Sequence, residues 1–319
     1  MGGAGENKMS FDRNPAILTM RTKTELVEYV IGLFEEEGSM SLLDIPPNIF
    51  RAFTEKVSRH YRQNPYHNFH HAVDTVNTIC WMISRPRLHE ELPLEHRFLM
   101  LFVALIHDVE HPGHNNMWEV QISTPRALKF ENEAVLEKHS LDVTRRLLAD
   151  PATNLFQGRS PEEVQTWMAL VDEMVLATDF AMHRKFLDDF SKFLDTHTID
   201  FRDPQSLSWI CRSLIKAADI SNTSKPFTEA KVWGKRVMLE FWAQGVEERK
   251  RNLPVGPLND PETVKMNSAQ AGFIKFAVLE LFEKLIGIDP GLVDMLDNLR
   301  ENLSTYEEMA ARGNDGYFD

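Results

Sequence analysis

The stretch FLMLFVALIHDVEHPGH, residues 98–114, sets the expected fold and points to the chemistry. Its first nine residues, Phe98 to Ile106, are all apolar, and a helix that is apolar on every side belongs in the interior of a helical domain. His107 and Asp108 follow where that helix leaves the core. A buried carboxylate without a partner is strongly unfavourable, so Asp108 needs a positive partner, and a cation is the simplest one.

The same stretch contains a third candidate ligand, His111, four residues after His107. Residues four apart share one helix face, although Pro112 and Gly113 end the helix nearby. The alternative interpretation is a capped helix end with solvated histidines.

Helical patterns dominate the rest of the chain. Residues 203–219 show the 3, 4 spacing of one apolar helix face, with apolar residues at Leu207, Ile210, Cys211, Leu214, Ile215 and Ala218. Ser160, Pro161 and Glu163 fit the capping box and first turn of another helix. Alternating strand patterns are scarce. The sequence therefore predicts an all-α fold, a compact multi-helix domain.

Domain boundaries are weakly marked. We expect a flexible N-terminal lead over residues 1–15, one domain over residues 16–310, and a flexible tail over residues 311–319. The longest apolar run has nine residues, far short of the roughly 20 that span a bilayer, so no transmembrane segment is predicted.

Composition excludes some partners. Lys and Arg total 35 against 48 Asp and Glu, a net charge of −13, which argues against a nucleic-acid polymer as partner. The two cysteines, Cys80 and Cys211, give no disulfide framework. The start MGGAGE lacks the apolar core of a signal peptide. We therefore expect a cytoplasmic location.

Histidines gather in one part of the sequence, with nine of the twelve between His60 and His114. The segment YHNFHHAVD, residues 66–74, places His67 and His71 four apart and Asp74 one further turn along. A polar face on a surface helix is the alternative interpretation of this segment alone.

Asp219 lies at the end of the apolar-faced helix, residues 203–219. Together with the two histidine-rich segments, it indicates a two-metal hydrolytic site. One ion would take nitrogen and oxygen ligands from His71, His107, Asp108 and Asp219, a mixture that suits zinc. A second ion, held by few protein groups and many waters, suits magnesium. His67, left free of metal, could donate a proton to a leaving oxygen. Asp219 could instead cap the following turn.

The sequence resembles the catalytic domain of class I 3′,5′-cyclic nucleotide phosphodiesterases. Six stretches, spread from about residue 65 to 276, occur in that family's order: PYHNFHHAVD, ALIHDVEHPGHNN, VLEKHS, LATDFAMH, KAADISNTSKP and SAQAGFIKF. The HD pair alone would be weak, because many phosphohydrolases contain one, whereas six blocks in order are specific.

The resemblance implies roles for the candidate residues. His67 matches the acid that protonates the departing O3′ atom. His71, His107, Asp108 and Asp219 match the metal ligands, with Asp108 bridging both ions, zinc in the tighter site, and magnesium or manganese in the second.

The resemblance also implies an outer shell and a nucleotide pocket. His111, Glu137 and Thr178 match positions that hold metal-bound waters. In the pocket, the matches are Gln270 for the purine edge, Phe273 for stacking on the base, Val237 for the opposing apolar side, and Asn222 for the outer edge of the base. Without the flanking match, Phe273 and Val237 would also fit an ordinary core.

The sequence departs from the family pattern at several positions. Glu110 stands where the family usually has Asp, and His70 adds an imidazole just before His71. Lys138 and Ser140 stand where Asn and His are commoner. None of these removes a proposed ligand.

We therefore expect hydrolysis of a cyclic nucleoside 3′,5′-monophosphate to the 5′-monophosphate, by attack of a metal-bridging hydroxide with His67 as general acid. Cyclic AMP is favoured and cyclic GMP is close behind, because the amide of Gln270 can turn over. The alternatives are another HD-type phosphohydrolase, a catalytically inactive nucleotide sensor, and a purely structural helical scaffold. Regulatory domains outside this chain are a further expectation from the family.

Overall fold

The structure is a computed structural model that describes residues 16–313. Every regular element in that range is helical, and no strand occurs in it, so the prediction of an all-α fold is confirmed. The predicted lead, 1–15, and most of the predicted tail, 314–319, lie outside the described residues. Between residues 16 and 313, no helix is both long and apolar enough to cross a membrane.

Most of the elements follow one another with short connections, and the longer ones, residues 149–160 and 251–265, join α10 to α11 and α14 to α15. The α-helices of the described chain are α1 (Ala16–Thr19), α2 (Lys23–Glu37), α3 (Ser39–Leu42), α4 (Pro47–His60), α5 (Phe69–Ile83), α6 (Pro86–Glu91), α7 (Leu94–Ile106), α8 (Asn116–Gln121), α9 (Pro125–Lys129), α10 (Val135–Leu148), α11 (Pro161–Ala177), α12 (His183–Thr196), α13 (Pro204–Asp219), α14 (Phe227–Lys250), α15 (Met266–Phe273), α16 (Leu279–Ile288) and α17 (Val293–Ala311). Between them lie the 3₁₀ turns η1 (Phe180–Met182), η2 (Ser221–Ser224) and η4 (Pro290–Leu292), and a π-helical turn, η3 (Ile274–Val278).

Helix α7 is the centre of the core. All nine residues of its apolar run, Phe98 to Ile106, are at most 1% exposed. The helix packs against α5, α11 and α13, and α5 is itself buried along nearly its whole length. Packing against three other helices removes this apolar run from water on every side, as its sequence predicts.

The predicted faces and caps of two surrounding helices are observed. All six apolar residues expected on one face of α13 are buried. At the start of α11, the Ser160 hydroxyl accepts a hydrogen bond from the Glu163 backbone, and the Glu163 carboxylate accepts one from the Ser160 backbone. This capping box fixes the point where α11 begins.

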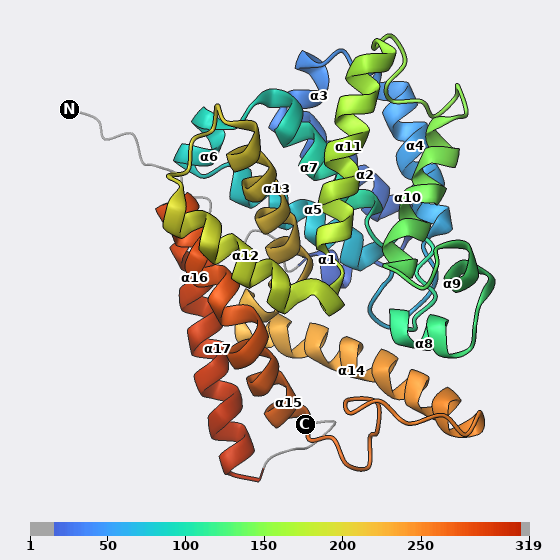
Figure 1. Ribbon diagram of the computed structural model, residues 1–319, viewed down its shortest axis with the longest axis vertical. Helices are drawn as coiled ribbons and strands as arrows, with labels where there is room; N and C mark the ends of the chain where they lie inside the picture. Colours follow the sequence, from blue (N-terminus) through green and yellow to red (C-terminus); the bar gives the residue numbers. More distant parts are fainter. Residues whose placement is uncertain (1–15, 314–319) are drawn as a thin grey trace.

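Figure 1 shows α5, α7, α11 and α13 side by side, with α14 to α17 forming the lower part of the molecule. The start of α5 meets the ends of α7 and α13, which brings residues from three distant parts of the sequence together. Helix α14 reaches the same place from the lower part. The polar residues analysed below all come from this junction.

Candidate metal centre

Four predicted ligands converge at the junction of α5, α7 and α13. The atoms are the Nε2 atoms of His71 and His107 and one carboxylate oxygen each from Asp108 and Asp219, all within 4.8 Å of one another. The two nitrogens are 3.2 Å apart, and the nitrogen–oxygen separations are 3.0–3.5 Å. Both imidazoles are at most 2% exposed.

These separations fit a divalent cation. An ion about 2.0–2.2 Å from each ligand in tetrahedral geometry keeps its ligands about 3.3–3.6 Å apart, and octahedral geometry brings neighbours to about 3.0 Å. The Nδ1 atom of His107 lies 3.0 Å from the carbonyl oxygen of Ala104, to which it can only donate, so its Nε2 lone pair faces the cluster. The cluster also lies at the C-terminal ends of α7 and α13, where helix dipoles favour a cation.

The electrostatics favour charged carboxylates at the cluster. Burial alone raises the pKa of Asp219, but the imidazoles of His107 and His71 outweigh it and hold that pKa below its ordinary range. Asp108 behaves in the same way. Burial lowers the pKa of His107, whereas the two carboxylates raise it well above its ordinary value. The site therefore has a strong affinity for positive charge, which protons or a bound cation can supply.

A second cluster, formed by His67, His111 and Glu240, adjoins the first. Glu240, on α14, accepts hydrogen bonds from the backbone N–H groups of Tyr66 and His67 at 2.9 and 3.0 Å, and its other oxygen pairs with Nδ1 of His67. The ring of His111 stacks on that of His67 with centroids 3.9 Å apart. Because the Glu240 oxygens are already occupied by these donors, this cluster positions His67 rather than presenting open ligands.

The surroundings shift the pKa values of the two stacked histidines, His67 and His111, in opposite directions. Burial lowers the pKa of His67, but Glu240, Asp108 and Asp219 more than offset it and raise that pKa to about 9. Burial and the neighbouring His67 lower the pKa of His111 to about 3. The Nδ1 atom of His111 accepts a hydrogen bond from the backbone of Gly113 at 3.1 Å. His67 therefore holds a proton more tightly than His111 does.

The remaining outer residues are placed by local contacts. Burial, followed by the charge of Asp179, raises the pKa of Glu137 to about 7, and the side-chain amide of Asn116 donates to it at 2.9 Å. The charge of Asp108 also raises the pKa of Glu137. Glu137 therefore interacts electrostatically with the metal cluster, the group formed by His71, His107, Asp108 and Asp219. Thr178 follows α11, and its hydroxyl donates to the Val175 carbonyl at 2.7 Å.

Two of the departures from the family pattern have a structural account. Glu110 adopts a left-handed backbone conformation, φ +64°, and its two oxygens bind His60 at 2.6 Å and His139 at 2.8 Å. The longer side chain thus ties the turn after Asp108 to α4 and α10. Nε2 of His70 donates to the Met20 carbonyl at 2.9 Å, away from the cluster, so His70 does not compete with its neighbour.

The other departures are peripheral. Ser140 donates to the Val109 carbonyl at 3.1 Å, and Lys138 pairs with Glu133 at 3.4 Å. Asp74, which the spacing placed near the histidines, instead forms a buried ion pair with Lys225 at 2.9 Å. Its carboxylate is therefore not part of the metal cluster.

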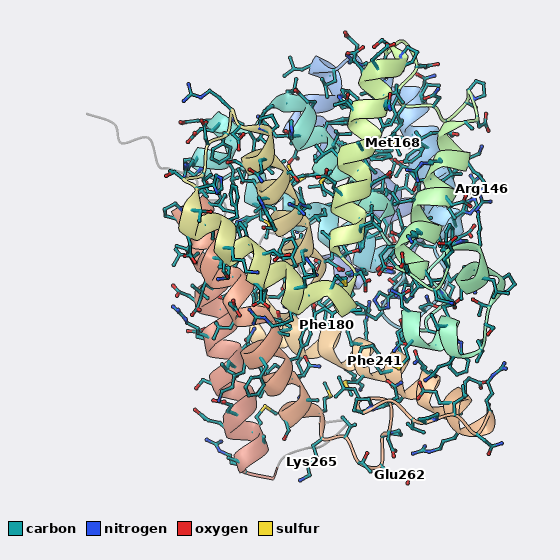
Figure 2. The ribbon with its side chains drawn as sticks, viewed as in Figure 1. Arg146, Met168, Phe180, Phe241, Glu262 and Lys265 are labelled. Atoms are coloured by element: carbon teal, nitrogen blue, oxygen red, sulfur yellow. The ribbon has the colours of Figure 1, made fainter. Side chains whose placement is uncertain are left out.

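Three of the four residues matched to nucleotide contacts lie on the lower helices α14 and α15. Gln270 and Phe273 share a face of α15, and Gln270 is buried. Phe273 is half-buried and lies 5.6 Å from Phe180, which Figure 2 labels just before α12. Val237 is half-buried on α14, one turn before Glu240.

The fourth of these residues, Asn222, lies in η2, and its Oδ1 accepts from the Tyr66 hydroxyl at 3.2 Å. Tyr66 also has its ring 4.6 Å from that of His71. Asn222 is thus joined to the metal cluster through one shared neighbour.

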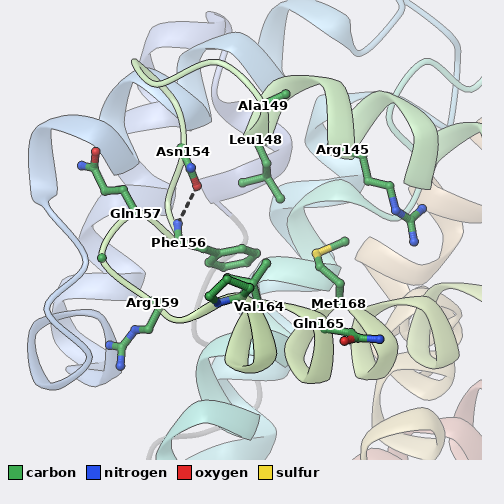
Figure 3. A pocket seen from close by; sticks show the side chains of 12 residues that line it. Arg145, Leu148, Ala149, Asn154, Phe156, Gln157, Arg159, Val164, Gln165 and Met168 are labelled. Atoms are coloured by element: carbon green, nitrogen blue, oxygen red, sulfur yellow. Dashed lines mark hydrogen bonds between the residues drawn. The ribbon is translucent and has the colours of Figure 1, made fainter.

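A separate pocket of about 680 Å³ lies between the end of α10 and the start of α11 (Figure 3). Its lining is mixed, with apolar residues such as Leu148, Phe156, Val164 and Met168 and with the polar residues Arg145, Asn154, Gln157, Arg159 and Gln165. The backbone N–H of Phe156 donates to Asn154 there at 3.0 Å. None of the predicted site residues lines this pocket. Its lining contains no histidine, cysteine or carboxylate, so it has none of the metal-ligating side chains found at the polar junction.

Glu240 is the site residue that the sequence reasoning missed. It lies 173 positions from the histidine that it holds. A signal was present: Glu240, Gln244 and Glu248 recur every four residues on α14, and all three are buried. A line of polar residues on the buried side of a helix indicates partners inside the protein.

Comparisons with known proteins agree with this arrangement. The family model described as 3′5′-cyclic nucleotide phosphodiesterase matches residues 66–299. The chain is 29% identical over 286 residues to human high affinity cGMP-specific 3′,5′-cyclic phosphodiesterase 9A, covering 89% of this chain and 48% of that protein. It is 32% identical over 286 residues to isoform F of the Drosophila melanogaster 3′,5′-cyclic-AMP phosphodiesterase, covering 87% of this chain and 43% of that protein.

A solved structure of LmjPDEB1 in complex with IBMX superposes on the chain with a TM-score of 0.86 at 27% sequence identity. The match covers 91% of this chain and 88% of that chain. The chain spans about half or less of the length of the curated relatives it matches first.

Proposed function

Because the chain belongs to the 3′5′-cyclic nucleotide phosphodiesterase family, we propose that it hydrolyses cyclic nucleoside 3′,5′-monophosphates to 5′-monophosphates. The observation that carries the proposal is the convergence of His71, His107, Asp108 and Asp219 on one point. Buried imidazoles and carboxylates at these separations suit a metal-assisted hydrolase and have no simpler role in packing.

Zinc is proposed at the four-ligand cluster, because two imidazole nitrogens and two carboxylate oxygens match its preferred donors. Magnesium or manganese is proposed at a second position, with Asp108 as the shared ligand and Glu137, Thr178 and His111 facing its waters. Bound ions would supply Lewis-acid stabilisation of the phosphate charge and activation of the attacking water.

His67 is proposed as the general acid. Its Nδ1 is held by Glu240, so its Nε2 is the nitrogen available to the leaving oxygen. The P–O3′ bond breaks as water adds to phosphorus, and the proton from His67 ends on O3′ to give the free 3′-hydroxyl. The Glu240 carboxylate at Nδ1 raises the pKa of His67, which favours the protonated ring that an acid needs.

The purine is proposed to lie against Phe273, with Val237 on its other face, Gln270 at its polar edge and Asn222 at its outer edge. Apolar burial on both faces would hold the ring, and hydrogen bonds at the edge would orient it. An amide presents one donor and one acceptor, so Gln270 can serve adenine or guanine. Cyclic AMP is the favoured substrate, with cyclic GMP also used.

Turnover of cyclic AMP, cyclic GMP and deoxynucleoside triphosphates, measured by chromatography before and after chelation, tests the proposal. We expect 5′-monophosphates from the cyclic nucleotides only, and loss of activity on chelation that magnesium restores. Cleavage of triphosphates alone would indicate another phosphohydrolase of the HD type. Nucleotide binding without consumption would indicate a sensor domain.

A further inference from the structure

A buried lysine lies one turn before the metal ligand Asp219 and takes no part in the proposed reaction. Lys216, on α13, is only 2% exposed. Burying a lysine amine is unfavourable unless its N–H groups find acceptors. Its Nζ donates to the carbonyl oxygen of Ala177 at 2.8 Å and to that of Asp179 at 3.4 Å. The amine is therefore bound to the backbone of a different segment.

The two carbonyls belong to the C-terminal end of α11. Ala177 is the last residue of that helix, and the last carbonyls of a helix receive no N–H from a following turn. A cation at this end also interacts favourably with the helix dipole, yet α11 has no basic residue in its own last turn. Lys216 supplies both interactions from the neighbouring helix. Because α11 and α13 pack together, one side chain fixes the end of α11 relative to α13.

The turn that follows α11, residues 178–180, reaches both parts of the proposed active site. Thr178 is the residue proposed to face the waters of the second ion. After burial, the charge of Asp179 is the largest cause of the raised pKa of Glu137, so the turn also lies near that outer residue. The ring of Phe180 lies 5.6 Å from that of Phe273. A shift of this turn would therefore disturb the metal side and the recognition side together.

The amine of Lys216 has charged neighbours as well as backbone partners. Burial lowers the pKa of Lys216 to about 8, and Asp219, Asp179 and Glu137 oppose that shift. A lysine ammonium near a bound magnesium ion repels it, so the charge alone would weaken magnesium binding. Hydrogen bonds that hold the turn would strengthen it. The two roles predict opposite results when the amine is removed.

From these contacts we infer that Lys216 is a positioning residue, which holds the turn of residues 178–180 in place through the carbonyls of Ala177 and Asp179. The inference rests on the proposed function, in which Thr178 faces the waters of the second ion. Lys216 acts on the reaction through the backbone of this turn and not by contact with substrate.

The first test measures the turn itself. Lys216→Met keeps the apolar stem and removes the donors. In the protein as purified, without added magnesium, we expect backbone amides of residues 178–183 to exchange with deuterium at least about fivefold faster than in the wild type. Amides of α17 serve as the internal reference and should be unchanged. Equal exchange at residues 178–183 in the two proteins would overturn the inference.

The second test measures the magnesium requirement. We expect Lys216→Met to raise the magnesium concentration for half-maximal turnover of cyclic AMP by about tenfold, with zinc content unchanged and kcat at saturating magnesium within about threefold. Lys192→Met, on α12 with a side chain that is 76% exposed, is the control. An unchanged requirement would overturn the inference. A lowered requirement would also overturn it, because it would show that Lys216 acts as a charge.

Lys216→Gln decides the question if Lys216→Met does not fold, as circular dichroism and thermal melting would show. The amide is neutral but keeps N–H donors on a shorter side chain, so we expect the magnesium requirement to rise about threefold. A fall or no change in this variant would overturn the inference in the same way.

A double-mutant cycle identifies the residue through which Lys216 acts. In a Thr178→Val background the hydroxyl is absent, so adding Lys216→Met should raise the magnesium requirement by no more than about twofold. A further tenfold rise would show that Lys216 acts by another route and would overturn the inference. Failure of the wild type to hydrolyse any cyclic nucleotide would overturn both the inference and the proposed function, whereas the other contrary results leave the proposed function intact.

Discussion

The metal cluster and the proposed base-recognition residues occupy neighbouring helices but are held in place in different ways. At the cluster, two buried imidazoles and two carboxylates are fixed by charge and by hydrogen bonds such as that from His107 to Ala104. In the recognition region, Gln270 has an amide bound by no described residue, and Phe180, beside Phe273, is 47% exposed. Buried charge defines one region, and apolar packing defines the other.

Because the two regions are held in different ways, we expect the metal cluster to control the rate of the reaction and the recognition region to control the choice of substrate. Charges buried in a low-dielectric interior tolerate little displacement, because an unpaired one is costly. Apolar contacts are less directional, so the recognition region can accept more than one base. We expect substitutions in the first region to abolish turnover and substitutions in the second to redistribute it between substrates.

Asp219→Ala should give the largest effect. The change removes one of two carboxylates from between two buried imidazoles, so we expect loss of tightly bound zinc and a fall in kcat on the order of 10³-fold or more. Metal analysis and steady-state kinetics measure both. Asp297→Ala, at an exposed position on α17, is the control. Full activity of Asp219→Ala without bound metal would show that the four-residue cluster does not hold a metal needed for turnover.

His67→Ala should separate proton delivery from metal binding. We expect kcat to fall about a hundredfold or more, since general acid catalysis typically contributes that much, while zinc content stays unchanged. His197→Ala, an exposed histidine after α12, is the control. Equal turnover of the variant and the wild type would remove His67 from the mechanism.

Glu240→Gln should change the pH profile. As the proposed general acid, His67 acts in its protonated form, so activity falls as pH rises through its pKa, which the Glu240 carboxylate helps to raise. The neutral amide lowers it, so we expect the alkaline limb of kcat to move to lower pH by about one unit, with kcat reduced about tenfold. Glu247→Gln, on the same helix and paired with Lys250, should leave the limb in place. An unmoved limb in Glu240→Gln would mean that this carboxylate does not tune the acid.

Phe273→Ala should give the smallest effect. Loss of one stacked ring weakens base binding, so we expect KM to rise about fivefold with little change in kcat. Phe276→Ala, three residues later and 81% exposed, is the matched control. A large loss of kcat in Phe273→Ala would show that the two regions are coupled more tightly than their contacts indicate.

Much of the fold and the metal cluster could be predicted because the signals are local. Nine apolar residues in a row, Phe98 to Ile106, specify a buried helix without reference to the rest of the chain. His107 and Asp108 follow it directly, so their location at the edge of the core needs only the helix to form. The apolar face of α13 places Asp219 at a similar edge by the same reasoning.

Other features depend on contacts between distant residues and could not be predicted from spacing. Asp74 lies three residues after His71, yet its carboxylate pairs with Lys225, 151 positions away. Glu240 depends on how α14 crosses the junction. The hydrogen bonds from Lys216 to the end of α11 likewise depend on two helices meeting, and no periodicity in either helix indicates them.

Anomalous diffraction at the zinc edge, from crystals of the protein as purified, tests the central claim most directly. The account predicts one dominant peak about 2.0–2.2 Å from the Nε2 atoms of His71 and His107 and from carboxylate oxygens of Asp108 and Asp219. A dominant peak elsewhere, or these four side chains coordinating nothing in crystals grown with zinc, would contradict it.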